Sequence, residues 1–181
     1  MSFKKILVAI DNSPLCPYVF EATLELAQSN QGLIKLLHCI SPEGIAEPML
    51  PSVSLDATMP STLMVNDYET QHILMERQLE EGKALLKQYG EAASLHGVAT
   101  ESECLIGDAG HQLCEVAKVW AADLVVVGRR GRTGLAEAFL GSVSNYVVHH
   151  APCSVLVVQE VGSESVTAYS DQTLRGGDRP L

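Results

Sequence analysis

One stretch, from Leu124 to Val158, constrains the fold of this chain more than any other. It opens with a short β-branched run, Leu124–Val127, and closes with another, Val155–Val158. Such runs are typical of strands that are buried on both faces of a sheet. Between them lie a glycine-rich loop and a helical pattern over Val143–His150, which Pro152 ends. The order strand, loop, helix, strand predicts two parallel strands joined by a helical crossover.

The rest of the chain repeats this alternation. Apolar runs at Lys4–Ile10, Leu33–Ile40 and Val98–Ile106 predict three more strands. Helical patterns fill the intervals between the runs, including a long one over Asp67–Leu95. Polar positions within Val98–Ile106 indicate an edge strand. We therefore expect an α/β fold, an open five-stranded parallel sheet with helices on both faces.

A single domain accounts for residues 1–160 of the 181-residue chain. Within it, residues 41–66 carry four prolines and no sustained periodicity, which predicts a long loop insertion. Three roles for this loop stay open: a lid over a ligand, a partner-binding surface, and a passive insertion. Residues 161–181 are polar and are predicted to be a disordered tail.

The acidic balance and the cysteine pattern argue against several classes of function. A formal net charge of −10 argues against nonspecific nucleic-acid binding, because neutralising phosphates requires a basic surface. No apolar run approaches the length of a membrane span, and Asp11 closes the first run before any signal-peptide cleavage site. Five cysteines without a CxxC pair suit a reducing compartment. We expect a cytoplasmic protein that binds neither nucleic acid nor membrane.

Three local patterns have structural interpretations. Ser13, followed by Pro14, predicts the N-cap of the first helix. Trp120, the only tryptophan of the chain, is predicted to be a core residue. His149 and His150 are adjacent on a helix and do not share a face, so the helix dipole explains them better than a metal does.

The glycines of the first stretch indicate phosphate binding. Gly128, Gly131 and Gly141 let a phosphate group approach the backbone. Gly141 and Ser142 open a helix, whose free amides attract anions. Arginines at positions 129, 130 and 132 add positive charge beside this loop. The alternative is a plain strand–loop–helix connection, in which the glycines serve only as turn residues.

The spacing Gly128-x2-Gly131-x9-Gly141-Ser142 resembles the nucleotide-binding signature of the universal stress protein family. The resemblance extends over roughly residues 3–160 and includes the segments KKILVAIDNS, ADLVVVGRRG and GSVSNYVVHHAPCSVLVV. An intact glycine signature marks the ATP-binding branch of that family. The resemblance also implies a Rossmann-like, adenine nucleotide alpha hydrolase-like sheet of strand order 3-2-1-4-5. It further implies a homodimer, or a higher oligomer, through the final strand, Ser154–Val158.

The same resemblance implies which residues hold the nucleotide. Asp11 contacts the ribose or, through the nucleotide, a magnesium ion, and the backbone at Cys39 lies beside the adenine. The alternative for Asp11 is a turn residue that binds its own backbone. A side hypothesis is that oxidation of Cys39 adds a polar group beside the adenine and weakens nucleotide binding. The alternative is that Cys39 is a buried, inert thiol. The expected cofactor-binding residues are Ala9, Asp11, Cys39, Val127, Gly128, Gly131, Gly141, Ser142, Val143 and Ser144.

Three functions follow, in order of preference. The first is an adenine-nucleotide-binding stress-response or signalling protein that acts through conformation or an unknown protein partner. Its ligand is ATP with magnesium, or else ADP, AMP or cyclic AMP. The second is a slow ATPase or nucleotidyl transferase, although the chain has no GxxxxGK[ST] loop and no nucleophile–base pair by spacing. The third is a nucleotide-free chaperone or dimerisation module. We expect the protein not to be an enzyme.

Overall fold

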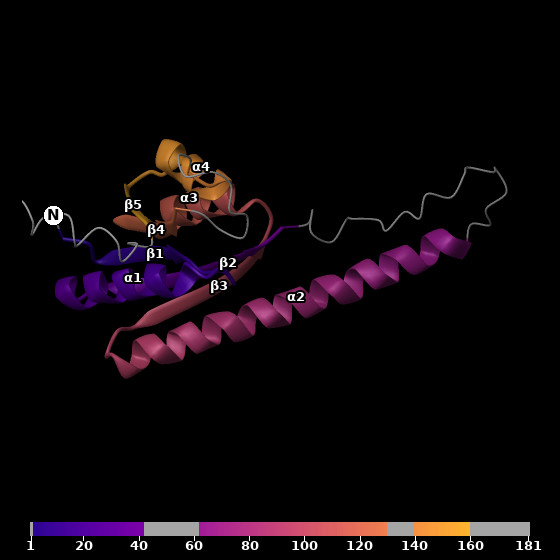
Figure 1. The fold of residues 1–181 in the computed structure, drawn as a ribbon, viewed down its shortest axis with the longest axis horizontal. Coiled ribbons are helices and arrows are strands. Elements are labelled where there is room, and N and C mark those ends of the chain that lie inside the picture. Colours follow the sequence, from indigo (N-terminus) through magenta and orange to yellow (C-terminus); the bar gives the residue numbers. More distant parts are fainter. Residues whose placement is uncertain (1, 42–61, 130–139, 160–181) are drawn as a thin grey trace, which may run out of the picture.

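The structure is a computed structural model and describes residues 2–41, 62–129 and 140–159. Strands and helices alternate along the chain, as the apolar runs predict (Figure 1). In chain order the elements are β1 (Lys5–Ala9), α1 (Cys16–Asn30), β2 (Leu33–Ile40), α2 (Thr62–Leu95), β3 (Thr100–Ile106), α3 (Ala109–Trp120), β4 (Leu124–Gly128), α4 (Ser142–His150) and β5 (Ser154–Val158).

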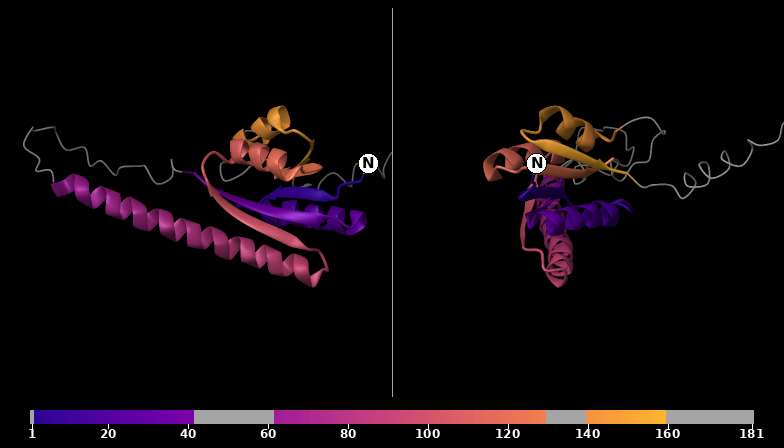
Figure 2. Two further views of the ribbon diagram at one scale, coloured as in Figure 1. Left: turned by 180° about the vertical axis from the view of Figure 1, so that it is seen from behind. Right: turned by 90° about the vertical axis from the view of Figure 1, so that its left-hand side faces the viewer.

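The five strands form one parallel sheet in the order β3-β2-β1-β4-β5, which confirms the expected topology. Helices α1 and α2 cover one face of the sheet, and α3 and α4 cover the other (Figures 1 and 2). Because every strand runs in the same direction, all five carboxyl ends lie along one edge of the sheet. In an open parallel sheet this edge is where ligands bind.

The central strands explain why their sequences are continuous apolar runs. Ile6, Leu7 and Val8 of β1 are fully buried, and so are Val125 and Val126 of β4. Their side chains alternate between the two faces and enter two separate hydrophobic cores, one beneath α1 and α2 and one beneath α3 and α4. A strand that is buried on both faces has no position for a polar side chain.

Helix α2 is longer than the sequence predicts. It begins at Thr62 rather than at Asp67, so the last five residues of the expected 41–66 loop are helical, while residues 42–61 lie outside the described residues. Thirty-four residues at about 1.5 Å each exceed the length of any strand, and the N-terminal half of α2 projects beyond the sheet (Figure 1). The C-terminal half packs on the sheet, with Gly82, Leu86 and Ala93 buried.

The start of α1 also differs from the prediction. The helix begins at Cys16, its N-cap position is Leu15, and no side chain caps it. Ser13 is not the cap; it is buried, and its hydroxyl donates a hydrogen bond to the Asp11 carboxylate over 2.6 Å. Here the Asp11 side chain competes for the serine that would otherwise cap the helix.

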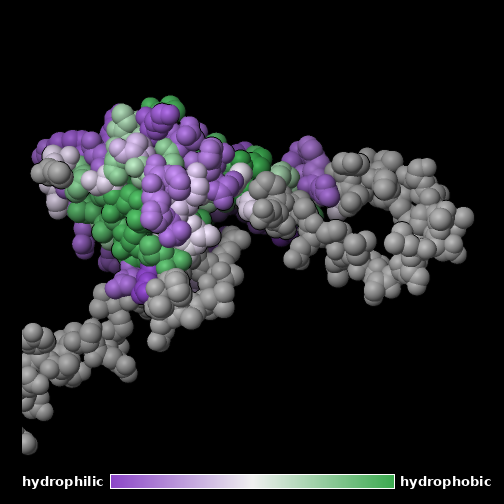
Figure 3. All heavy atoms as spheres, turned by 90° about the horizontal axis from the view of Figure 1, so that it is seen from above, coloured by the Kyte–Doolittle hydropathy of each residue, from purple (hydrophilic) through white to green (hydrophobic). Residues whose placement is uncertain are grey.

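The two outer strands have different surfaces. At β3, Lys35 of the neighbouring β2 reaches Glu101 and Glu103 over 3.2 and 3.4 Å, which confirms a polar edge strand. At the other end, the residues of β5 from Val155 to Val158 are half-buried, and Val148 on α4 is 45% exposed. Figure 3 views the molecule from the side of α3 and α4 and shows a hydrophobic area bordered by hydrophilic side chains.

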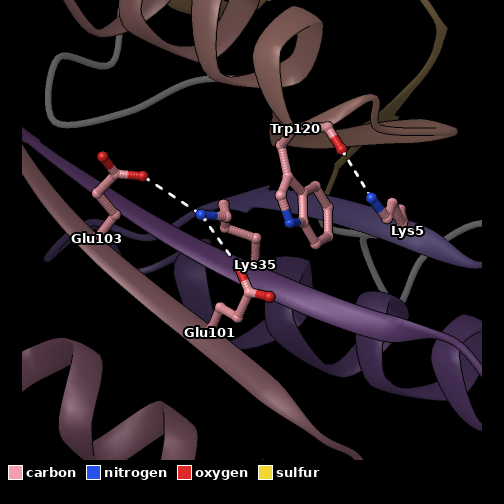
Figure 4. A network of polar contacts seen from close by, with 5 residues as sticks. All are labelled: Lys5, Lys35, Glu101, Glu103 and Trp120. Carbon is pink, nitrogen blue, oxygen red and sulfur yellow. Dashed lines mark hydrogen bonds and ion pairs between the residues drawn. The ribbon is translucent and has the colours of Figure 1, made fainter.

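Trp120 lies at the margin of a core rather than inside it. It is partly buried and packs against the core beneath α3 and α4. The ammonium groups of Lys5 and Lys35 lie 5.3 and 5.5 Å from its ring centroid, and Lys5 also donates to the Trp120 carbonyl oxygen over 3.0 Å (Figure 4). The Trp120 ring therefore both packs against the core and makes cation–π contacts with two lysines.

The histidines and cysteines of the described residues have structural surroundings. His150 packs on Tyr146 at a centroid distance of 4.1 Å, and its Nδ1 atom lies 2.8 Å from the Tyr146 carbonyl oxygen. Across the described ranges, no three His, Cys, Asp or Glu side chains converge as a metal site would require, and the five cysteines are free. Among the same residues, no helix is both long enough and apolar enough to cross a membrane.

Candidate functional site

A cavity of about 460 Å³ lies at the carboxyl edge of the sheet, at the ends of β1, β2 and β4. Its size falls in the range of small-molecule sites in proteins. The order β2-β1-β4 changes direction here, because the chain passes from β1 to β2 on one side and reaches β4 on the other. A change of this kind opens a crevice between the loops that follow neighbouring strands.

Nine of the ten residues expected to bind a nucleotide line this one cavity. The tenth, Gly131, lies outside the described residues. The residues come from four separate parts of the chain, and only the parallel pairing of β1 with β2 and β4 brings them together. Their role in binding stays a prediction. The nine are Ala9, Asp11, Cys39, Val127, Gly128, Gly141, Ser142, Val143 and Ser144.

The N-terminus of α4 opens into the cavity without a side-chain cap. Gly141 occupies the cap position in an extended conformation, and its carbonyl oxygen accepts the first helical hydrogen bond, from Asn145 at 2.9 Å. The amides of Ser142, Val143 and Ser144 have no acceptor among the described residues. Three unpaired amides at the positive end of a helix dipole are suited to an anion.

The Ser144 side chain is not available to a ligand. It is 1% exposed, and its hydroxyl lies 2.9 Å from the Arg129 carbonyl oxygen and 3.0 Å from that of Gly141. The Gly141 amide in turn donates to the Arg129 carbonyl over 2.7 Å. These bonds join Arg129, at the end of β4, to the start of α4, so Ser144 can contact a ligand only through its backbone.

Asp11 takes the turn role that the sequence leaves open, and it also lines the cavity. Its Oδ1 atom accepts hydrogen bonds from the amide and the hydroxyl of Ser13, at 2.9 and 2.6 Å, as in an Asx turn. Its Oδ2 atom has no partner among the described residues, and the side chain is only partly buried where it lines the cavity. One carboxylate oxygen therefore holds the turn, while a binding role for the other oxygen stays a prediction.

Cys39 lines the cavity as a protonated thiol. Burial, followed by the neighbouring Cys104, Asp108 and Glu103, raises its pKa from the ordinary 9.0 to about 12. The thiolate, which is the reactive form, is then scarce near neutral pH. This disfavours the hypothesis that Cys39 is an oxidation sensor.

Part of the cavity wall is not apparent from the sequence. His38 and Cys16 line the side that faces α1 and α2, and Gln78, Glu81 and Gly82 of α2 complete it. Strand alternation alone places His38 on the face opposite Cys39. No local pattern in the sequence shows that α2 crosses the sheet at this point, where Gly82 approaches His38.

Comparison with known proteins agrees with the observed fold and identifies the family of this chain. Residues 2–159 match the Universal stress protein family. Universal stress protein Sll1388 of Synechocystis is 37% identical over 159 residues, which cover 88% of this chain and 99% of that protein.

Among solved structures, the hypothetical protein MJ0577 aligns with a TM-score of 0.73 at 21% identity, covering 90% of this chain and all of the other. A universal stress protein in complex with cAMP aligns with a TM-score of 0.58 at 19% identity, covering 88% and 98%. An Arabidopsis thaliana family member with AMP bound aligns with a TM-score of 0.55 at 25% identity, covering 91% and 97%. From the family match over residues 2–159, this chain is a member of the universal stress protein family.

Proposed function

We propose that the cavity binds an adenine nucleotide, with its phosphates at the N-terminus of α4 and its adenine beside Cys39. The observation that carries the proposal is a single cavity that is lined by Asp11 and by residues 142, 143 and 144. The Asp11 Oδ2 atom and these three amides have no partner within the described part of the chain. Family members that are described with AMP and with cAMP support an adenine nucleotide as the ligand.

ATP with magnesium is the preferred ligand under this proposal. The glycine signature continues beyond Gly128 through the loop to Gly141, which allows a triphosphate to lie along the backbone. Asp11 Oδ2 would bind the ribose or a magnesium ion carried by the phosphates. The protein would act through its nucleotide-bound conformation rather than through catalysis, as a stress-response protein that presents this conformation to a partner.

Calorimetric titration of nucleotide-free protein with ATP, ADP, AMP and cyclic AMP, with magnesium and with EDTA, tests the proposal. We expect micromolar binding of at least one nucleotide and no release of phosphate over the titration. Binding of ATP that is equal in magnesium and in EDTA would remove the metal from the proposal. Absence of heat with all four nucleotides would contradict the proposal itself.

Two substitutions at Ser142 distinguish the contribution of its backbone amide to binding from that of its side chain. Ser142 is the first helical residue, where proline is well tolerated, and Gly141 has the extended backbone that a following proline requires. Ser142→Pro therefore removes one amide donor and keeps the helix, whereas the matched Ser142→Ala removes only the hydroxyl. We expect about a tenfold or greater loss of nucleotide affinity for S142P and about threefold or less for S142A. Equal affinities in the two variants would place the phosphates elsewhere.

We also propose that two copies of this chain pair through β5. This strand ends the described sheet, so its outer backbone groups have no strand neighbour there, and its side chains are only half-buried. Such an edge is a template for pairing with another chain. Val148 of α4 is exposed, and the view from the side of α3 and α4 shows a hydrophobic area (Figure 3).

A further inference from the structure

The peptide that joins Ile10 to Asp11 is held at both of its edges by buried side chains. The Nδ1 atom of His38 lies 2.7 Å from the Ile10 carbonyl oxygen, and His38 is 6% exposed. Because a carbonyl oxygen only accepts, Nδ1 carries the proton and donates it. At the opposite edge, the Asp11 amide lies 3.4 Å from the Cys16 sulfur. The peptide unit is planar, so these two contacts together set the direction in which the chain enters Asp11.

Helix α2 supports both of these side chains. Gly82 approaches His38 so closely that a Cβ atom at position 82 would lie 2.6 Å from the His38 Cδ2 atom. About two turns further along α2, the Tyr89 hydroxyl interacts with the Cys16 thiol and opposes the rise in the pKa of that thiol caused by burial. The imidazole therefore has little room to turn away from Ile10, and the thiol has a polar neighbour on α2.

Backbone contacts fix the same point from within the sheet. The Ile10 amide donates to the Leu37 carbonyl over 2.9 Å, so Ile10 is bonded to β2 through its amide and through its carbonyl. The next residue is Asp11, whose Oδ1 atom is held by Ser13. With the backbone and one carboxylate oxygen fixed, the position of Oδ2 at the cavity is determined.

We propose that His38 is a positioning residue for the ligand: by donating to the Ile10 carbonyl beneath Gly82, it holds the Asp11 carboxylate in place at the cavity. His38 acts through Asp11 and need not touch the nucleotide. The effect on affinity rests on the proposed function, whereas the placement of Asp11 is a property of the ligand-free protein and can be measured without any nucleotide.

A matched pair of substitutions at position 38 tests this role. In His38→Asn, the side-chain Nδ2 atom is as far from the backbone as Nδ1 of histidine, so the donor to Ile10 is kept. In His38→Leu, the apolar volume is largely kept and the donor is lost. His38→Gln, whose amide lies one bond further out, replaces the leucine variant if that variant does not fold. The measurements are the backbone amide resonances of Asp11 and Ser13 in the ligand-free protein, and calorimetric affinity for the nucleotide that the wild type binds.

We expect H38L to shift both amide resonances and to weaken nucleotide binding about tenfold or more, and H38N to resemble the wild type in both measurements. Wild-type resonances and affinity in H38L would overturn the proposal, as would equal changes in H38L and H38N, which would assign the effect to ring packing. If the wild type binds no nucleotide, the proposed function fails, and the amide resonances alone decide whether His38 holds Asp11.

Discussion

The partly buried Cys39 thiol is one group that makes the stability of this protein depend on pH. In the unfolded chain the thiol ionises near its ordinary pKa of 9.0, whereas in the folded protein its pKa is raised to about 12. Between these values the folded state holds a proton that the unfolded state has released. Stability from this group is therefore complete below pH 9 and falls as the pH rises toward 12.

We expect the free energy of unfolding to decrease above pH 9, with a contribution from Cys39 of at most about 1.4 kcal/mol per pH unit. Chemical denaturation at pH 7, 9 and 10 measures this, and Cys39→Ala serves as the comparison because it removes the ionising group. The pH dependence should be smaller in C39A than in the wild type. An identical dependence in the two proteins would show that the Cys39 thiol ionises normally in the folded state.

At the scale of elements, α2 contacts the sheet at two glycines that have different surroundings. At Gly82 a Cβ atom would lie 2.6 Å from His38 Cδ2 and 2.9 Å from Cys104 Sγ, which is closer than packed atoms allow. At Gly90 the nearest atom would be Thr100 Oγ1 at 3.4 Å, an ordinary contact. The two glycines lie on the same helix and against the same face of the sheet, so each is a control for the other.

We expect Gly82→Ala to destabilise the protein by about 1–3 kcal/mol through overpacking, partly offset by the gain in helix propensity. Gly90→Ala should instead stabilise it by about 0.5–1 kcal/mol, because alanine favours the helix and meets no obstacle. Urea denaturation of both variants measures the difference. A G82A variant as stable as G90A would mean that α2 does not press on His38.

At the scale of the whole molecule, the prediction concerns association through β5. Tyr146 of α4 packs against Gly110 of α3, and Val148, two residues further round the helix, points away from α3 and is 45% exposed. Because α4 lies over β4 and β5, this places Val148 on the side of the β5 edge. Val119 on α3 is 85% exposed but lies on the β2 side of the same face, where the proposed interface does not reach.

We expect the wild type to sediment at twice the mass of one chain and Val148→Lys to shift the equilibrium toward the monomer. A lysine at this position would bring a like charge from each copy toward the interface. Val119→Lys introduces the same charge and should leave the dimer intact. Sedimentation equilibrium over a range of concentrations measures all three proteins. A monomeric wild type, or equal effects of the two lysines, would contradict pairing through β5.

The sequence by itself determined the order of the elements and pointed to residues that share one cavity. The β-branched runs of β1 and β4 predict buried parallel strands because a strand with cores on both faces cannot include polar positions. Asp108 directly precedes α3 and caps it, because its carboxylate accepts the His111 amide at 2.8 Å. The glycine spacing led to Gly128 and Gly141, which do lie at one cavity. All of these depend on interactions within a few residues, which leave a local pattern.

Tertiary structure alone decided the contacts between distant segments. The sequence does not show that His38 bonds to the Ile10 carbonyl, or that Ser13 bonds to Asp11 instead of capping α1. Nor does it show that two lysine ammonium groups contact the Trp120 ring. The sequence also does not show that α2 begins at Thr62. The N-terminal part of this helix projects beyond the sheet, so its residues after Pro60 need no amphipathic stripe. Each contact depends on strand register and on where a helix crosses the sheet. Strand register and helix crossing points are set by packing of the whole domain, so they cannot be predicted from any short segment of the chain.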